Sequence, residues 1–278
     1  MSRLETRDLT IRFGGHVAVN AVTCSFEPGT LTAIVGPNGA GKTTYFNLIS
    51  GQLKASSGSV SLGGRDLSGM SASERTHAGL GRAFQLTNLF PRLTVLENVR
   101  LAVQASRGGP HRRGLNLWSV WSDHRTLLQH ADEILGSIAL KDKEHELVAN
   151  LPHGDQRKLE VALLMALEPQ VFMFDEPTAG MNAAEAPVIL DLIRRLKADR
   201  SKTILLVEHK MDVVRELADR IIVLHNGSLV ADGEPAEVIA SPVVQEAYLG
   251  LSPQDASGGT DTPPHPDLPP SGGRSKQP

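Results

Sequence analysis

The chain has 278 residues, of which 40% are hydrophobic and 21% charged, and its 28 basic and 31 acidic side chains give a formal net charge of −3. These proportions are typical of a folded globular protein and exclude a disordered or collagen-like chain. The near-neutral balance argues against a nucleic-acid-binding protein that depends on a broad basic surface, so we expect no nucleic-acid partner.

The hydropathy pattern predicts neither a membrane span nor a leader peptide. The longest uninterrupted apolar run, Val161–Leu167, has seven residues, whereas a transmembrane helix needs about 18–20. The N-terminal residues lack the apolar core of a signal peptide. The single cysteine, Cys24, excludes an internal disulfide framework and fits a reducing compartment. If the protein works at a membrane, we expect a partner to take it there.

Short strands dominate the expected structure of the first 65 residues. Apolar alternation and Gly/Pro turns predict strands at Leu4–Phe13, Val17–Phe26, Thr30–Val35 and Gly58–Leu62. A glycine-rich loop follows the third strand. After it, a helix is expected at Lys42–Ser50, where Gly51 ends it.

The middle of the chain, from Thr94 to Leu167, has a helical pattern with an interruption near Ser106–Gly114. After it, strands are expected at Val171–Phe174, Thr203–Val207, Ile221–Leu224 and Ser228–Ala231, and helices at Ala184–Lys197 and Met211–Ala218. This alternation predicts an α/β fold with a mostly parallel sheet covered on both faces. Residues 251–278 contain 7 Pro, 4 Gly and 4 Ser and are expected to be a disordered tail.

A phosphate-binding pattern, G-x-x-x-x-G-K-[ST], lies between an expected strand and helix as Gly36-Pro37-Asn38-Gly39-Ala40-Gly41-Lys42-Thr43. The glycines let successive backbone N–H groups turn toward one anion, and the helix N-terminus adds partial positive charge. We expect Lys42 to reach the β- and γ-phosphates, Thr43 to give its hydroxyl to Mg²⁺, and Thr44 to make a further phosphate contact. A chance match in a glycine-rich turn is the alternative, and the strand–helix context weighs against it.

An apolar strand ends in two carboxylates, Asp175 and Glu176. Adjacent residues of a strand point to opposite sides, so one carboxylate can face a metal ion and the other an attacking water. We expect Asp175 to be a Mg²⁺ ligand, through water, and Glu176 to be the general base that polarises the attacking water. A solvated loop start is the alternative, and the phosphate-binding pattern upstream favours the catalytic interpretation.

Four shorter signals accompany these motifs: Gln85 in Gly-Arg-Ala-Phe-Gln-Leu, the segment 151–156 (Leu-Pro-His-Gly-Asp-Gln), the segment 179–182 (Ala-Gly-Met-Asn), and His209 in Val-Glu-His. In this order, the set resembles the nucleotide-binding subunit of ABC transporters over about Leu4 to Gly250. The resemblance implies an α/β P-loop NTPase (RecA-like) core with an N-terminal antiparallel β subdomain and an inserted α-helical subdomain at about 87–165. It also implies one ABC ATPase domain over 1–250, followed by the tail 251–278.

Individual roles follow from the resemblance. Gln85 is similar to the glutamine that contacts Mg²⁺ and water and reports to the transmembrane partner. His209 is similar to the histidine that hydrogen-bonds the γ-phosphate. Phe13 is similar to the aromatic residue that stacks on adenine, with simple core packing as the alternative. ATP and Mg²⁺ are the implied cofactors.

The segment 151–156 resembles the signature loop, which in this family caps the ATP of the opposite subunit, and Gly154 could present its amide there. Pro152 stands where serine is usual, and it has neither a hydroxyl nor a backbone N–H for a γ-phosphate contact. The segment 179–182 resembles the loop at the dimer seam, with Asn182 where Asp is usual.

Several segments resemble the ATPases of branched-chain amino-acid importers: 13–15 (Phe-Gly-Gly), 47–51 (Asn-Leu-Ile-Ser-Gly), 179–182 and 247–250 (Ala-Tyr-Leu-Gly). Importers of urea and short amides share much of this pattern, and a regulatory ABC ATPase without a transporter also stays open. The resemblance implies a second ABC ATPase subunit (identical or paralogous), transmembrane permease subunits and a periplasmic substrate-binding protein. It places the protein as a peripheral subunit at the cytoplasmic face of the inner membrane.

Other P-loop classes fit less well. A DNA-acting ABC ATPase carries a long coiled coil, whereas 65 residues separate Gln85 from Leu151. A ribosomal ABC protein holds two cassettes, and a P-loop kinase or GTPase would lack the segment 151–156. Trp118 and Trp121 lie in the expected helical insert. They fit either a docking surface for membrane subunits or lipid headgroups, or a surface helix that packs two aromatic residues, which we favour.

Overall fold

The computed structural model describes residues 2–83, 89–107, 119–181 and 185–249. The elements follow in this order: β1 (Leu4–Phe13), β2 (His16–Phe26), β3 (Leu31–Val35), α1 (Lys42–Ser50), β4 (Ser57–Leu62), β5 (Arg65–Asp66), α2 (Ala72–His77), β6 (Leu80–Ala83), α3 (Val95–Arg107), α4 (Ser119–Ser137), the 3-10 turns η1 (Lys141–Lys143) and η2 (Val148–Asn150), α5 (His153–Ala166), β7 (Val171–Asp175), α6 (Ala186–Ala198), β8 (Thr203–Val207), α7 (Met211–Leu217), β9 (Arg220–His225), β10 (Ser228–Gly233), α8 (Pro235–Ala240) and α9 (Pro242–Leu249).

The elements expected before residue 65 and after residue 170 are confirmed to within two residues at each end. The elements β5, α2, β6, α8 and α9 were not predicted, because each is short. In β6, Gly81 and Arg82 also break the apolar run. The helical stretch is interrupted between α4 and α5, where the two 3-10 turns lie. An interruption was expected near Ser106–Gly114, but α3 continues to Arg107, and residues 108–114 lie outside the described residues. The predicted disordered tail and Trp118 also lie outside them.

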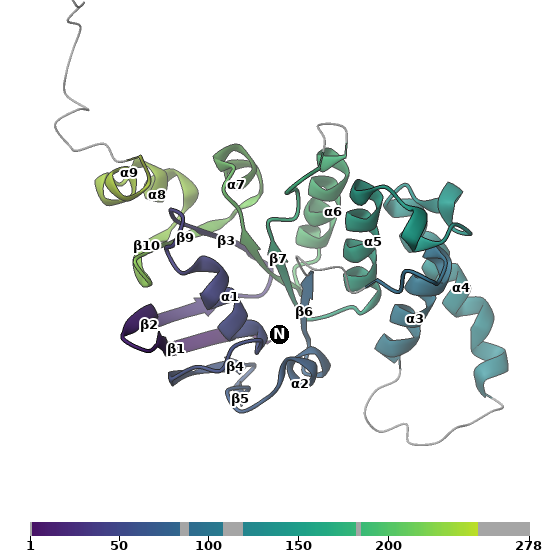
Figure 1. The fold of residues 1–278 in the computed structure, drawn as a ribbon, viewed down its shortest axis with the longest axis horizontal. Helices are drawn as coiled ribbons and strands as arrows, with labels where there is room; N and C mark the ends of the chain where they lie inside the picture. Colours follow the sequence, from purple (N-terminus) through teal and green to yellow (C-terminus); the bar gives the residue numbers. More distant parts are fainter. Residues whose placement is uncertain (1, 84–88, 108–118, 182–184, 250–278) are drawn as a thin grey trace, which may run out of the picture.

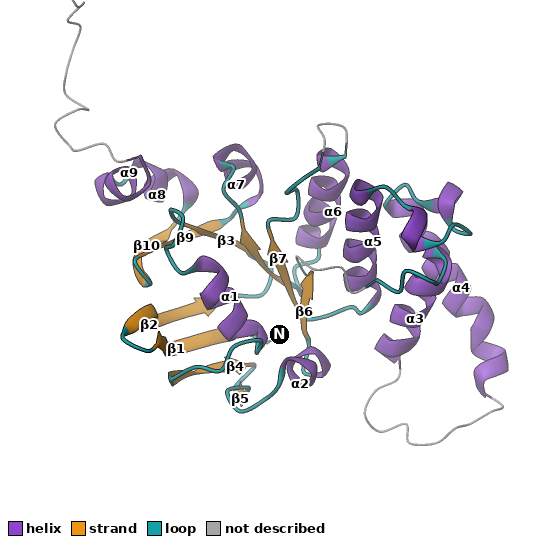
Figure 2. Cartoon of the chain, viewed as in Figure 1, coloured by secondary structure: helices purple, strands orange, loops and turns teal. Residues whose placement is uncertain are grey.

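Two sheets organise the fold (Figure 1). The larger one has the strand order β10-β9-β3-β8-β7-β6, and its strands are parallel except for β10, which pairs antiparallel with β9. The smaller one has the order β2-β1-β4-β5 and is antiparallel throughout. Figure 2 shows helices on both sides of the larger sheet and α3, α4 and α5 gathered at one end of the molecule. This arrangement confirms the expected P-loop core with an antiparallel N-terminal part and an inserted helical part.

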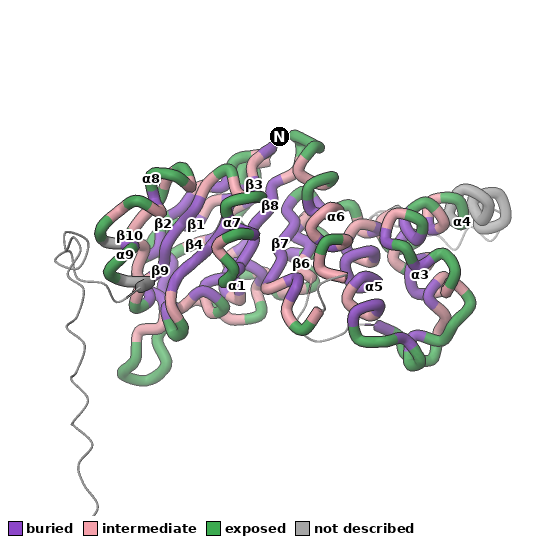
Figure 3. The backbone as a smooth tube through the Cα atoms, turned by 90° about the horizontal axis from the view of Figure 1, so that it is seen from above, coloured by how far each residue is buried: buried purple, intermediate pink, exposed green. Residues whose placement is uncertain are grey.

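Successive side chains of the central strands enter different hydrophobic cores. In β7, Phe172 and Phe174 pack in the cluster that contains α5 and α6, whereas Val171 and Met173 pack in the cluster that contains α1 and the smaller sheet. In β8, Ile204 and Leu206 likewise face the first cluster. Because both faces are covered, these strands are continuous apolar runs, as expected for a parallel sheet. Figure 3 shows buried positions along nearly the whole length of these strands.

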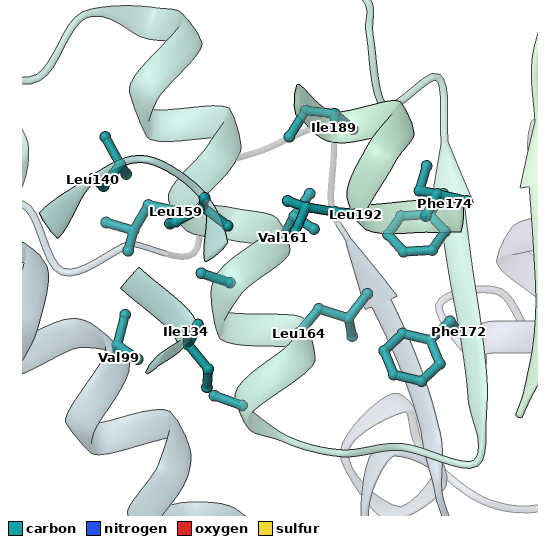
Figure 4. Packing of buried hydrophobic residues seen from close by; sticks show 14 of the residues in the cluster. Val99, Ile134, Leu140, Leu159, Val161, Leu164, Phe172, Phe174, Ile189 and Leu192 are labelled. Atoms are coloured by element: carbon teal, nitrogen blue, oxygen red, sulfur yellow. The ribbon is translucent and has the colours of Figure 1, made fainter. Parts of the chain in front are cut away.

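The helical part joins the sheet through α5. Figure 4 shows Leu159, Val161 and Leu164 of this helix between the side chains of α3 and α4 and the phenylalanines of β7. Val99 of α3 and Ile134 of α4 belong to the same buried cluster as Phe172. One continuous core therefore connects the helical part to the central sheet. Within the described ranges, none of the helices has both the length and the apolar character needed to cross a bilayer.

Replacing Phe172 by alanine tests how much this shared core contributes to the free energy of unfolding. Phe172 is 1% exposed, and Phe→Ala in a core costs about 3–5 kcal/mol of unfolding free energy. Phe90 is 55% exposed and is the matched control; its replacement should cost about 0.5 kcal/mol or less. Urea unfolding of both variants measures the difference, and equal losses would contradict the role of the shared core.

Candidate active site

The carboxyl ends of β3, β7 and β8 meet at one edge of the larger sheet. Val207 of β8 is paired with Ile34 of β3 on one side and with Asp175 of β7 on the other. From these ends the chain continues into the phosphate-binding loop, into Glu176 and toward His209. Parallel register therefore brings together segments that are far apart in the sequence, in the crevice where α/β sheets bind ligands.

A pocket of about 350 Å³ lies at this edge of the sheet. It is lined by the phosphate-binding loop together with the two polar residues that follow β7 and β8. The lining residues are His16, Ala18, Asn38, Gly39, Ala40, Gly41, Lys42, Thr43, Thr44, Glu176 and His209. The structure thus gathers most of the residues that the sequence singled out for phosphate binding and hydrolysis.

The phosphate-binding loop packs closely against neighbouring backbone. Gly41 precedes the first residue of α1 and has a φ of 95°, a conformation that glycine adopts without penalty. A Cβ at this position would lie 2.5 Å from the carbonyl oxygen of Ala18 in β2. The same Cβ would lie 3.3 Å from the Cα of Gly227, whose N–H donates to the oxygen of Ala40 at 3.0 Å. The loop is therefore held against both the smaller sheet and the β9–β10 turn, with the N-terminus of α1 open to the pocket.

Lys42 lies inside this loop and is 6% exposed. Its Nζ donates to the carbonyl oxygens of Gly36 at 2.7 Å and Pro37 at 2.9 Å. Burial lowers the pKa of Lys42 below the usual lysine range, and the nearby carboxylates of Glu176 and Asp175 counteract part of this shift. The ammonium group is thus held against the backbone of the phosphate-binding loop through the carbonyl oxygens of Gly36 and Pro37.

Asp175 is buried at the end of β7, and its side chain is 0% exposed. Its Oδ2 accepts a hydrogen bond from Arg82 Nη2 at 2.9 Å. Burial raises the pKa of Asp175 above its usual range, and the Arg82 guanidinium opposes this shift. The second oxygen, Oδ1, is buried without a hydrogen-bond partner in the part of the chain that the structure describes. A buried carboxylate oxygen needs a partner, and carboxylate and hydroxyl oxygens are the ligands that Mg²⁺ prefers, so Asp175 and Thr43 are of the type that would hold this ion.

Glu176 and His209 form a hydrogen-bonded pair at the wall of the pocket, with 2.6 Å between Oε1 and Nε2. Glu176 has a φ of 49°, a left-handed conformation that costs a non-glycine residue about 1–2 kcal/mol. Its N–H donates to the oxygen of Val207 at 2.9 Å, which holds the turn. We expected strand alternation to point the two carboxylates in opposite directions. In the structure β7 ends at Asp175, so the direction of Glu176 is set by the left-handed turn after the strand. Such strained residues gather at functional sites.

Glu208 is a buried carboxylate that the sequence analysis missed. Its Oε1 accepts from Thr178 Oγ1 at 3.0 Å, and its Oε2 accepts from the N–H groups of His209 at 2.7 Å and Lys210 at 3.2 Å. These bonds tie the loop after β8 to the loop after β7. The available signal was an acidic residue directly after a five-residue apolar strand. Arg82, the other missed residue, is a charged residue inside the short strand β6.

The remaining predicted site residues have different surroundings. Phe13 is 50% exposed at the end of β1, so core packing as its role is wrong. It is paired with His16, which lines the pocket. Gly154 lies in the first turn of α5 and is not among the lining residues. Gln85 and Asn182 lie outside the described residues.

Comparisons with known proteins agree with this geometry. Residues 19–179 match the sequence profile of the ABC transporter family. Residues 228–250 match the profile described as branched-chain amino acid ATP-binding cassette transporter. The high-affinity branched-chain amino acid transport ATP-binding protein BraF of Pseudomonas aeruginosa is 35% identical over 253 residues, which cover 90% of this chain and 99% of the relative. The corresponding protein LivG of Escherichia coli (strain K12) is 37% identical over 248 residues, 89% of this chain and 97% of LivG.

Solved structures give the same result. A nucleotide-free ATP-binding cassette from an ABC transporter matches with a TM-score of 0.74 and 29% identity, over 90% of this chain and 100% of that chain. An ATP-binding cassette in its ADP conformation matches with a TM-score of 0.74 and 30% identity, with the same coverage. A dimeric cassette in a post-hydrolysis state, bound to ADP and phosphate, matches with a TM-score of 0.70 and 25% identity, over 84% of this chain and 98% of that chain.

The larger sheet, the phosphate-binding loop after β3 and the two carboxylates at the end of β7 define a P-loop ATPase. The family profile and the relatives refine this class, because they match most of the chain. The chain belongs to the ABC transporter family and is an ATPase subunit homologous to branched-chain amino-acid transport ATP-binding proteins.

Replacing Gly41 by alanine tests the packing of the loop. The positive φ costs about 1–2 kcal/mol, and the Cβ meets the Ala18 oxygen at 2.5 Å, so the loop must move. We expect ADP affinity, measured by calorimetry, to fall by roughly tenfold or more. Gly39 is the matched control: its φ is 79°, but a Cβ there would meet nothing within 4 Å. Equal losses in the two variants would show that the contact with β2 does not position the loop.

Proposed function

We propose that this chain powers the uptake of branched-chain amino acids through separate transmembrane subunits. The observation that carries this proposal is the match of residues 228–250 to the branched-chain amino acid cassette profile, together with full-length relatives named for this transport. The general ABC profile covers only residues 19–179. The C-terminal match therefore supports the particular branch of the family.

The residues of the pocket support a mechanism based on positioning and charge. Lys42 and the amides of the loop, Gly36 to Thr44, bind the β- and γ-phosphates of ATP. Glu176 orients the attacking water and accepts its proton. His209 hydrogen-bonds the γ-phosphate, and in the structure it lies 2.6 Å from Glu176 through Nε2 and Oε1. Phe13, exposed beside the His16 edge of the pocket, stacks on the adenine ring.

Thr43 and Asp175 would hold Mg²⁺, with Gln85 as a further ligand from the segment after β6. Bound Mg²⁺ would neutralise charge on the phosphate oxygens during hydrolysis. Among the residues that the structure describes, Oδ1 of Asp175 has no hydrogen-bond partner, which supports this assignment. Divalent magnesium in nucleotide sites commonly uses only one or two protein carboxylates, with phosphates and waters completing its shell.

We infer that two such subunits, identical or paralogous, act together. Gly154 and the rest of segment 151–156 do not line the pocket of their own chain, which supports a role for them at the ATP of a second subunit. The dimeric post-hydrolysis cassette supports the same arrangement. We assign 1–250 to one ABC ATPase domain, with 87–165 as its helical subdomain, bound peripherally to permease subunits at the cytoplasmic face of the inner membrane. A periplasmic substrate-binding protein completes the proposed importer.

Replacing Glu176 by glutamine separates binding from hydrolysis. The amide keeps the size of the side chain but cannot take a proton, so ATP binding should persist. The rate of phosphate release should fall by about 10²–10⁴-fold, the usual contribution of a general base. Glu237→Gln, an exposed carboxylate of α8, is the control and should hydrolyse ATP normally. Wild-type turnover in the Glu176 variant would remove the base assignment.

Transport itself is tested by disrupting the gene and measuring uptake of radiolabelled leucine. We expect uptake to be lost, and to be restored by the wild-type chain but not by Glu176→Gln. Loss of urea uptake with normal leucine uptake would instead assign the protein to urea and short-amide importers. Normal uptake of both, without co-purification of integral membrane proteins, would point to a regulatory ATPase.

A further inference from the structure

Arg82 is a buried cation next to the active site with no role in the mechanism described above. It lies in β6, at the edge of the larger sheet and three residues before Gln85. Its side chain is 7% exposed, and its partner Asp175 is 0% exposed. A charge buried this deeply requires several good partners, because desolvation is costly.

The two ends of the guanidinium fork serve two different parts of the fold. Nη2 donates to Oδ2 of Asp175 at 2.9 Å. Nη1 lies near three oxygens at the end of α1, namely Asn47 Oδ1 at 2.6 Å, Ser50 Oγ at 3.0 Å and Gln52 Oε1 at 3.0 Å. The guanidinium carbon also lies 5.0 Å from the ring centroid of Phe46 in α1. Arg82 therefore joins the end of β7 to the helix that follows the phosphate-binding loop.

The hydrogen bonds of Arg82 connect the elements that carry the two residues proposed to hold Mg²⁺. Asp175 ends β7, and Thr43 lies in the first turn of α1, four residues before Asn47. Because Oδ2 of Asp175 is bound by Arg82, the carboxylate cannot turn freely, and Oδ1 remains without a partner in the described structure. The fork thus fixes both the rotation of the carboxylate and its position relative to α1.

We propose that Arg82 is a positioning residue, which orients Asp175 so that Oδ1 stays available to the divalent cation and which holds Asp175 in place relative to Thr43. The proposal rests on the assignment of Asp175 as a Mg²⁺ ligand. This role explains why the residue is an arginine. The two nitrogens Nη1 and Nη2 reach Asn47 and Asp175 at the same time, which the single ammonium nitrogen of a lysine cannot do with the same geometry. Hydrogen bonds to the ligands of a metal commonly change its affinity by about 10–100-fold.

The test measures the Mg²⁺ dependence of nucleotide binding and not ATP hydrolysis. A fluorescent ADP analogue is titrated into the full chain, with EDTA and then with increasing Mg²⁺. In Arg82→Lys and Arg82→Gln, we expect affinity in EDTA to match the wild type, because the phosphate-binding loop is intact. The Mg²⁺ concentration that gives half of the affinity gain should rise by about 10–100-fold.

Arg75 provides a matched control. It is a buried residue of α2 whose guanidinium donates to the carbonyl oxygens of Leu48 and Ile49 at the end of α1, both at 2.7 Å. Its hydrogen bonds in the described structure go to main-chain carbonyls. Arg75→Lys should therefore lower the thermal midpoint but leave the Mg²⁺ dependence of nucleotide binding unchanged.

The outcomes separate this proposal from the metal assignment. If Asp175→Asn loses the Mg²⁺ dependence while folded Arg82 variants keep it, Arg82 does not position the ligand and the proposal is overturned. If Asp175→Asn keeps the wild-type dependence, the metal assignment fails and the proposal fails with it. Should Arg82→Gln not fold, Arg82→Lys decides alone. An equal shift in Arg75→Lys would mean that any disturbance of α1 weakens the cation, which also overturns the proposal.

Discussion

The close contact of the phosphate-binding loop with two other backbone segments is the constraint on which the site depends. A side chain at Gly41 would collide with the carbonyl of Ala18, and Gly227, which lies next to Ala18, donates to the oxygen of Ala40. Gly227 in turn accepts a hydrogen bond from the N–H of Asn20 at 2.8 Å. The loop, β2 and the β9–β10 turn therefore form one packed unit. The smaller sheet is thus part of the nucleotide site and not an appendage, because it limits where the loop can lie.

The central strands transmit this constraint to the helical part. Phe172 and Phe174 pack against α5 and α6, and the next residue of the same strand is Asp175. A displacement of α5 relative to the sheet would change the packing of Phe172 and Phe174, which lie in the same strand as the buried carboxylate of Asp175. Close-packed interiors do not deform gradually; they change between discrete packing arrangements. The geometry around Asp175 and the position of the helices are therefore physically linked through β7.

Local patterns predicted most of the site, and long-range contacts account for the rest. The loop from Gly36 to Thr43 could be identified because its function depends on glycines and a lysine at adjacent positions. Arg82 could not be placed, because its partner Asp175 is 93 residues away and meets it only through the pairing of β6 with β7. The role of Glu208, which directly precedes His209, could not be predicted, because the hydroxyl that it accepts from belongs to Thr178, 30 residues away. Sequence reasoning also placed Glu176 on the strand, whereas tertiary contacts hold it in a left-handed turn.

Pro152 of the signature segment is the N-cap residue of α5, where it leaves the backbone hydrogen bonds of the helix intact but supplies no side-chain cap. Pro152 occupies the residue before α5, with φ −55° and ψ 154°. This φ is the one that the pyrrolidine ring imposes, and the first N–H groups of a helix have no partner within the helix in any case. Helix α5 therefore begins at His153 without loss of a helical hydrogen bond, and Gly154 keeps its buried place in the first turn, against the carboxylate of Glu185. What the proline removes is a hydroxyl, which at this position could cap the N-terminus of α5 or contact a ligand.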